Sequence, residues 1–328
     1  MPKYGDERWC EEVLKELREN GLSVLEDVIQ AEECDTYRQQ YHTWVTTLRE
    51  DGEWPKSKRS LIQHYRVGHL EATWAVRLKT KPVFAKLWGT NKLLSSIDAV
   101  AIGRPPEGGE EEFHTPDCYQ WLHLDQSAKR VGLHAYQGSV QLEDTAEDDW
   151  CFVAMPTSVT YFDEFCRTFP HGPTLQTNND FYRLKAKEVE WYKSKGCEIK
   201  RIAAPKGSMI LWDSRTVHAN APPMKNRNNP GRWRYVVFVA MAPAIWASAE
   251  DMQVKKRAYK ELRMTQHWPA QGVNYFQDLN YAGCKVMKTH SKLGRSEEVR
   301  LLAGDLEYDF NDGEPNGPEW RPQWNLPA

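Results

Sequence analysis

The sequence predicts a mainly β fold with flanking helices, of the α+β class. Short apolar stretches bounded by Gly, Pro or acidic residues recur in the middle of the chain, as strands do. Stretches with a helical spacing of apolar residues lie before and after them. The chain of 328 residues is 40% hydrophobic and contains 14 Trp, 14 Tyr and 10 Phe, which is ample material for a buried core.

The N-terminal part is expected to be largely helical. Trp9, Val13 and Leu17 share one face of a helix over residues 6–20, and Gly21 is a suitable end for it. A short strand over residues 22–25 follows, and then a second helix over residues 31–50.

The central part is expected to alternate strands and turns. Predicted strands cover residues 95–102, 132–137, 138–142, 150–155, 207–213 and 235–240. Predicted helices cover residues 159–169, 179–195 and 246–265. From Gly304 the chain becomes acidic and rich in Pro, so we expect a tail without regular structure. Its residues Trp320 and Trp324 suggest that it docks on the body or on a partner subunit.

Two histidines and one aspartate form a candidate metal site. His123 and Asp125 are two residues apart, so their side chains point the same way on a strand. The predicted strand over 207–213 delivers His218 just beyond its end. Two His and one carboxylate are the facial triad of non-haem Fe(II) oxygenases, which leaves positions open for a 2-oxo acid and dioxygen. We therefore expect His123, Asp125 and His218 to be the metal ligands and the catalytic centre.

Two arginines are candidates for binding a 2-oxoglutarate co-substrate. The far carboxylate of that molecule requires a cation with forked donors. Arg232 and Arg234 lie after His218, at the start of the predicted strand over 235–240. Because they are two residues apart, both can face one cavity.

In their order along the chain, these features resemble the Fe(II)/2-oxoglutarate-dependent dioxygenases of the phytanoyl-CoA dioxygenase (PhyH-like) family. The resemblance covers roughly residues 10–245 and rests on four segments, namely residues 19–28, His123-Leu124-Asp125, residues 207–218 and the strand that follows Arg232. It implies a double-stranded β-helix, the cupin-like jelly roll, with Fe(II) held by His123, Asp125 and His218. It also implies that Arg232, in preference to Arg234, holds the distal carboxylate of 2-oxoglutarate.

The jelly roll implies a single catalytic domain over residues 1–328. Within it, we expect a helical N-terminal part over 1–92 and a core over 93–245 with a helical insertion at about 159–196. Residues 246–328 would then form a C-terminal helix and an irregular tail.

The resemblance implies an oxygenase that oxidises a C–H bond of a small molecule, with Fe(II) as cofactor and 2-oxoglutarate and dioxygen as co-substrates. Succinate and carbon dioxide are the co-products, and ascorbate is a candidate reductant. Hydroxylation is the favoured outcome, while desaturation, epimerisation and cyclisation share every sequence feature. A zinc hydrolase and a jelly-roll binding module without chemistry are more distant alternatives.

The amino-acid composition limits the classes of binding partner and the cellular compartment that we expect. Lys plus Arg number 43 and Asp plus Glu 46, a net charge of −3, which does not favour nucleic acid. Seven cysteines without a Cys-x-x-Cys pair are typical of a reducing compartment. No apolar signal core or membrane-length apolar run is present, so a cytoplasmic protein is expected.

A free small molecule is the expected substrate, by elimination. Pocket candidates close in sequence to the triad are Arg104, Gln120, Trp121, Tyr136 and Gln137. We interpret the basic stretch over residues 56–59 as a solvated turn, with contact to an anionic substrate as the alternative.

Overall fold

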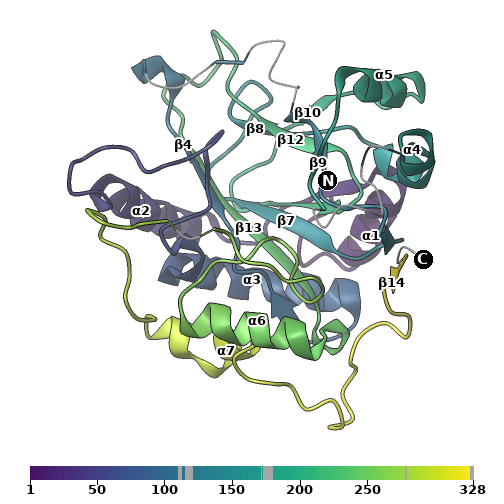
Figure 1. Ribbon diagram of the computed structural model, residues 1–328. Helices are drawn as coiled ribbons and strands as arrows, with labels where there is room; N and C mark the ends of the chain where they lie inside the picture. Colours follow the sequence, from purple (N-terminus) through teal and green to yellow (C-terminus); the bar gives the residue numbers. More distant parts are fainter. Residues whose placement is uncertain (110–112, 115–120, 171, 173–179, 278, 326–328) are drawn as a thin grey trace.

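Two antiparallel sheets with helices around them form the body of the protein (Figure 1). The computed structural model describes residues 1–109, 113–114, 121–170, 172, 180–277 and 279–325. The predicted mainly β class with flanking helices is confirmed.

The helices in the described residues are α1 (Trp9–Asn20), α2 (Ala31–Thr47), α3 (Glu71–Trp88), α4 (Phe162–Thr168), α5 (Ala186–Ser194), α6 (Ala249–Lys260) and α7 (Glu297–Ala303). Gly21 ends α1 with φ of 77°, the left-handed conformation that glycine adopts without strain. Two expectations fail here. The predicted helix over 179–195 begins with a strand, and α5 starts only at Ala186, where Glu188 completes a capping box. Helix α7 interrupts the part of the chain after α6, where no helix was predicted.

The strands in the described residues are β1 (Leu22–Leu25), β2 (Leu61–Ile62), β3 (Leu93–Ser95), β4 (Val100–Gly103), β5 (His123–Leu124), β6 (Arg130–Val131), β7 (Tyr136–Gln141), β8 (Cys151–Ala154), β9 (Tyr182–Arg183), β10 (Lys200–Ile202), β11 (Met209–Asp213), β12 (His218–Ala221), β13 (Arg234–Pro243) and β14 (Gln323–Trp324). The strand predicted over 95–102 is replaced by two strands, β3 and β4. Both pair with β13, but at different positions along it, and the chain between them is not in a strand. The strands predicted over 132–137 and 138–142 are instead the single strand β7.

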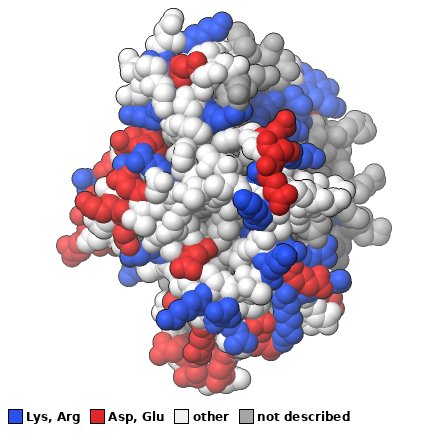
Figure 2. All heavy atoms as spheres, turned by 90° about the vertical axis from the view of Figure 1, so that its left-hand side faces the viewer, with Lys and Arg blue, Asp and Glu red and all other residues white. Residues whose placement is uncertain are grey.

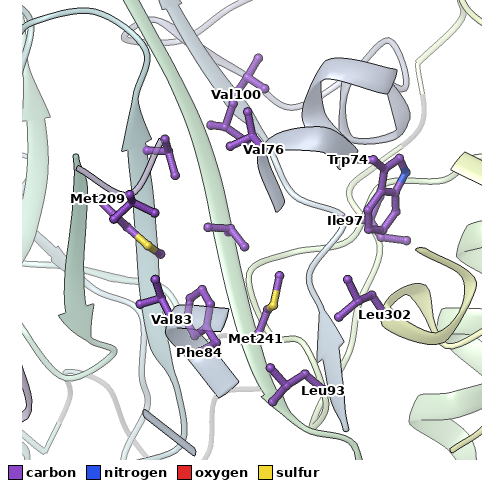
Figure 3. Close-up of a cluster of buried hydrophobic side chains, with 14 of the residues drawn as sticks. Trp74, Val76, Val83, Phe84, Leu93, Ile97, Val100, Met209, Met241 and Leu302 are labelled. Carbon is purple, nitrogen blue, oxygen red and sulfur yellow. The ribbon is translucent and has the colours of Figure 1, made fainter. Parts of the chain in front are cut away.

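The larger sheet carries the main hydrophobic core. Its order is β1-β11-β7-β13-β4-β2, and β3 also pairs with β13. Helix α3 packs against β13, and α7 packs against β3. Figure 3 shows Val83 and Phe84 of α3 beside Met241 of β13, with Leu302 of α7 close to Leu93. Burial of such side chains supplies most of the stabilisation of this layer.

The smaller sheet has the order β10-β8-β12-β5-β9 and faces the larger one. A cluster of buried side chains joins the two, because Phe152 of β8 packs with Ile210 and Trp212 of β11 and with Phe238 of β13. Helices α4 and α5 cover the other side of the small sheet, where Phe162, Phe165 and Tyr192 are buried. Two facing antiparallel sheets with the metal candidates on the smaller one are consistent with a double-stranded β-helix.

The chain after α7 is mostly irregular, as predicted, and runs along one side of the molecule to β14 (Figure 1). There β14 pairs with β6. Trp320 packs edge-on against Trp88 with a centroid distance of 6.3 Å, and the Trp324 ring lies 4.3 Å from the guanidinium of Arg130. The prediction that these tryptophans dock on the body is confirmed.

The charged side chains are mixed on the surface. Figure 2 shows Lys and Arg interspersed with Asp and Glu on one face, with uncharged residues between them. Among the helices of the described residues, none is both long and apolar enough to span a membrane.

Candidate active site

Two neighbouring strands of the smaller sheet bring the two candidate histidines together. His123 on β5 and His218 on β12 are directly paired across the antiparallel ladder. Their ring centroids are 4.3 Å apart. A pairing of this kind places the two side chains on the same face of the sheet, so residues almost a hundred positions apart in the sequence share one site.

Asp125 completes the group. One of its oxygens lies 3.6 Å from His123 Nε2, and the other lies 3.2 Å from His218 Nε2. One potential ligand atom from each of the three residues lies within 4.8 Å of the others, and all three residues are buried. The structure thus brings together all three residues that the sequence singled out.

Main-chain groups hold both imidazole rings in one orientation. His123 Nδ1 lies 3.0 Å from the carbonyl oxygen of Trp121, and His218 Nδ1 lies 2.9 Å from that of Thr216. An Nδ1–H that donates to a carbonyl leaves the lone pair on Nε2, which faces the centre of the group. Gln137 donates a hydrogen bond of 3.0 Å to Asp125 Oδ2 and so restrains the carboxylate.

The electrostatic environment favours neutral histidine and ionised aspartate. Burial, followed by the proximity of His218, lowers the pKa of His123 to about 4. Burial alone would raise the pKa of Asp125, but His267, His123 and His218 outweigh it and hold that pKa well below its usual range. Neutral imidazoles beside a carboxylate are the protonation states that metal ligation requires.

The three residues lie in the wall of a cavity of about 370 Å³. Aromatic side chains from both sheets and from the loops around them form much of the lining, namely Trp121, Phe152, Phe181, Trp212, Phe238 and Phe276. The ring of Phe181 lies 4.8 Å from that of His123. Polar and charged side chains form the rest of the lining, so the cavity combines an aromatic wall with many polar groups, as a small-molecule site requires.

Arg234 is a buried cation beside this cavity. It shares the inward side of β13 with Phe238, which lines the cavity, because side chains alternate along a strand. Its guanidinium donates to Asn220 Oδ1 at 2.6 Å and to Ser60 Oγ at 3.1 Å. Both acceptors are neutral, and in the described part of the chain no carboxylate pairs with Arg234. Burial lowers the pKa of Arg234 to about 10, so the guanidinium remains charged near neutral pH.

Arg232 lies elsewhere. Its Nη1 donates to Asp149 Oδ2 at 2.8 Å, and Arg227 donates both to the other oxygen of Asp149 and to the carbonyl of Arg232. Arg232 is not among the described residues that line the cavity. Arg232 lies in the loop between β12 and β13, and its contact with Asp149 ties this loop to the segment just before β8.

The other pocket candidates have mixed outcomes. Trp121 and Gln137 line the cavity. Tyr136 points to the other side of the larger sheet, where its ring stacks on Trp88 at 4.8 Å. Arg104 lies over the ring of Trp54 at 4.5 Å, and Gln120 falls outside the described residues.

Several lining residues were not predicted. Asp98 comes from the connection between β3 and β4, and Gln266 and His267 come from the segment after α6. Lys58 and Arg59 also line the cavity, so the interpretation of their stretch as a merely solvated turn is incomplete. No motif marks these positions, since each is brought to the site by the fold.

Comparison with known proteins agrees with this geometry. The model of the phytanoyl-CoA dioxygenase (PhyH) family matches residues 17–234, and the chain belongs to this family. It is therefore an Fe(II)/2-oxoglutarate-dependent oxygenase. A curated relative, Ava biosynthesis cluster protein O of Aspergillus versicolor, is 24% identical over 290 residues, which are 81% of this chain and 86% of that protein.

Solved structures share the fold. The non-heme alpha ketoglutarate dependent carbocyclase SnoK from nogalamycin biosynthesis is 13% identical with a TM-score of 0.50, over 81% of this chain and 96% of that one. GlcNAc Inducible Gene 2, GIG2, from Candida albicans is 12% identical with a TM-score of 0.58, over 95% of this chain and 79% of that one. At such identities the likeness concerns the fold alone.

Proposed function

We propose that His123, Asp125 and His218 bind the catalytic Fe(II), and that the enzyme hydroxylates a C–H bond of a small molecule at this centre. The observation that carries the proposal is the convergence of two imidazole Nε2 atoms and one carboxylate in a single buried cavity. Three protein ligands on one side of the ion leave coordination positions open on the cavity side.

The donor set fits iron. Imidazole and carboxylate together are ligands of non-haem Fe(II), whereas closed structural zinc sites use four protein ligands. The Nδ1 contacts to Trp121 and Thr216 and the hydrogen bond from Gln137 supply the outer contacts that orient such ligands. When bound, iron and 2-oxoglutarate supply the oxidising chemistry, with dioxygen as the oxidant and succinate and carbon dioxide as co-products.

Arg234 is the residue we assign to the distal carboxylate of 2-oxoglutarate. A buried guanidinium needs an anionic partner, and its two described acceptors are neutral oxygens. Asn220 lies two residues after His218 on β12 and lines the cavity, so it connects the arginine with the metal site. Arg232 already pairs with Asp149, and we assign it a structural role.

The remaining residues orient the substrate and exclude water. The aromatic wall removes solvent from the space in front of the triad, which strengthens the polar contacts inside it. Asp125 is retained as a ligand, which favours hydroxylation over reactions that need its position open. Ascorbate would serve as a reductant that keeps the metal in the ferrous state. We treat residues 1–328 as a single catalytic domain with the site in its β core.

Other oxidative outcomes use the same site. The structural neighbour SnoK is a carbocyclase, so cyclisation, together with desaturation and epimerisation, is the main alternative. Product mass separates hydroxylation, which adds one oxygen atom, from epimerisation, which leaves the mass unchanged, and from desaturation and cyclisation, which both remove two hydrogen atoms. Desaturation and cyclisation give isomeric products, which NMR spectroscopy distinguishes.

The test is succinate formation by anaerobically purified protein after addition of Fe(II), 2-oxoglutarate, ascorbate and air. We expect slow succinate release even without substrate, dependent on iron and oxygen and lost in His218→Ala. The same assay with Zn(II) in place of Fe(II) should give none. Turnover that persists in His218→Ala, or activity supported by zinc without oxygen, would refute the proposal.

A further inference from the structure

A second polar group lies in the same cavity and is distinct from the residues assigned so far. Asp98 and His267 both line the cavity and come from segments far apart in the sequence. His267 follows α6 and lies beyond residues 17–234, the part of the chain that the family model matches. The metal triad and Arg234 do not use either residue.

Both side chains have unused hydrogen-bonding capacity. Asp98 is 7% exposed, and its single hydrogen bond within the described residues is from the Ala99 main-chain N–H to Oδ1, at 2.6 Å. The Nε2 atom of His267 is buried and has no hydrogen-bond partner among the described residues. Buried polar atoms are nearly always paired in folded proteins, so the unpaired His267 Nε2 in a cavity wall points to a ligand there.

The two residues lie close to the metal centre. His267 is near enough to Asp125 to contribute to the low pKa of that carboxyl group. The pKa of Asp98 is raised, chiefly by burial, and it too is influenced by His267 and Asp125. A molecule held by Asp98 or His267 therefore has its body in front of the triad. The same cavity is lined by aromatic rings, with Phe238 and Phe276 among them, so it suits a flat apolar body.

We propose that Asp98 and His267 form the polar anchor of the substrate, and that the substrate is a compact aromatic molecule whose hydroxyl or ammonium group donates a hydrogen bond to Asp98. This inference rests on the proposed function, because it places the anchored molecule before the metal triad. Donation to Asp98 satisfies the buried carboxylate, and His267 accepts or donates according to the group that the substrate presents.

The basic residues Lys58 and Arg59 at the same cavity would favour an anionic substrate instead, but the exposure of Lys58 and the position of Arg59 over an aromatic ring argue against it. Lys58 is exposed and Arg59 is half-buried, with its guanidinium 4.8 Å from the ring of Trp121. Solvent screens exposed cations, so they contribute little to the affinity for an anion. The buried carboxylate of Asp98 is the stronger determinant, because within the described residues only the Ala99 N–H donates to it and a buried acceptor left unpaired costs more than an exposed one.

The experiment compares three phenyl probes that differ at the polar end, namely 2-phenylethylamine, 2-phenylethanol and 3-phenylpropanoate. Their binding is measured by anaerobic calorimetry on the enzyme loaded with Fe(II) and 2-oxoglutarate. We expect the amine and the alcohol to bind more tightly than the carboxylate. Asp98→Asn should weaken the amine by at least about tenfold, since it removes a charge-assisted hydrogen bond but keeps an acceptor for the Ala99 N–H.

The control is Lys58→Ala, which should change the affinity for the amine by less than about threefold. If Asp98→Asn does not fold, His267→Ala is used in its place and should have a lower affinity for the alcohol probe than the wild type. The inference would be overturned if the wild type and Asp98→Asn bound the amine equally well, or if none of the three probes bound. It would also be overturned if the carboxylate bound most tightly and lost its affinity in Lys58→Ala. Binding of 2-oxoglutarate itself is recorded first, so failure at that step refutes the proposed function instead.

Discussion

Replacing Arg234 with Met should largely abolish 2-oxoglutarate binding, while replacing Arg232 with Met should not. Arg234 is buried, and its acceptors among the described residues are neutral, so a bound dicarboxylate would supply an anionic partner that these residues do not provide. Removal of one member of a buried, hydrogen-bonded charge pair costs about 2–5 kcal/mol. At about 1.4 kcal/mol per tenfold change, this corresponds to an increase in Kd of about 30-fold or more.

The assay is anaerobic calorimetric titration of the Fe(II)-loaded protein with 2-oxoglutarate. Arg232→Met is the matched control, because it removes the same side chain two positions away and affects only the contact with Asp149. Its Kd should remain within about threefold of the wild type. Arg234→Lys keeps the positive charge but not the forked donors of the guanidinium, so its Kd for 2-oxoglutarate should lie between those of the wild type and Arg234→Met. The reasoning is refuted if Arg232→Met loses binding and Arg234→Met retains it in a protein that still melts cooperatively.

Three further predictions concern stability and are measured by urea or thermal unfolding. Burial lowers the pKa of His69 to about 3, so between about pH 6.5 and pH 3 the unfolded chain binds a proton that the folded state does not. The free energy of unfolding should therefore fall as the pH drops below about 6.5, by about 3 kcal/mol at about pH 4. The variant His69→Gln should lack this part of the loss. Trp324→Ala removes a ring that stacks on Arg130 and should cost about 0.5–2 kcal/mol; no change in unfolding or in proteolysis of the tail would count against docking. Gly207→Ala should lower the free energy of unfolding by more than about 2 kcal/mol, because φ is +83° and a Cβ would overlap a main-chain oxygen. Gly5→Ala, at φ of +99° with open space around it, should cost about 1 kcal/mol. Equal effects of the two substitutions would contradict this prediction.

The grouping of His123, Asp125 and His218, our candidate metal site, was predictable because its geometry is largely local. His123 and Asp125 need only the two-residue period of a strand, and a turn-strand segment leads to His218. That His123 and His218 are direct cross-strand partners is a matter of register. Register depends on pairing between distant segments, which a single sequence does not display.

The choice between the two arginines shows where the sequence argument stopped. Arg232 and Arg234 have the same parity, so alternation alone does not separate them. What separates them is the position at which β13 begins to pair, which places Arg234 opposite Gly103 and leaves Arg232 in the preceding loop with Asp149. Strand boundaries are set by tertiary pairing and are the least certain part of any prediction from sequence.

The remainder of the cavity was out of reach for a similar reason. Asp98 and His267 have no motif, no fixed spacing and no common element. They meet because the segment after α6 returns to the cavity, a consequence of packing rather than of local pattern. The same holds for the strand β9, which lies in a segment with a helical pattern and forms because it pairs with β5.

The measurement that tests the account most directly is an anaerobic titration of the Fe(II)-loaded protein with 2-oxoglutarate, followed by the visible charge-transfer absorption that appears when a 2-oxo acid chelates ferrous iron. We expect one equivalent of 2-oxoglutarate to bind per chain, with the absorption lost in His218→Ala and retained in Arg232→Met. No absorption in the wild type, or an unchanged absorption in His218→Ala, would contradict the claim that His123, Asp125 and His218 hold the iron.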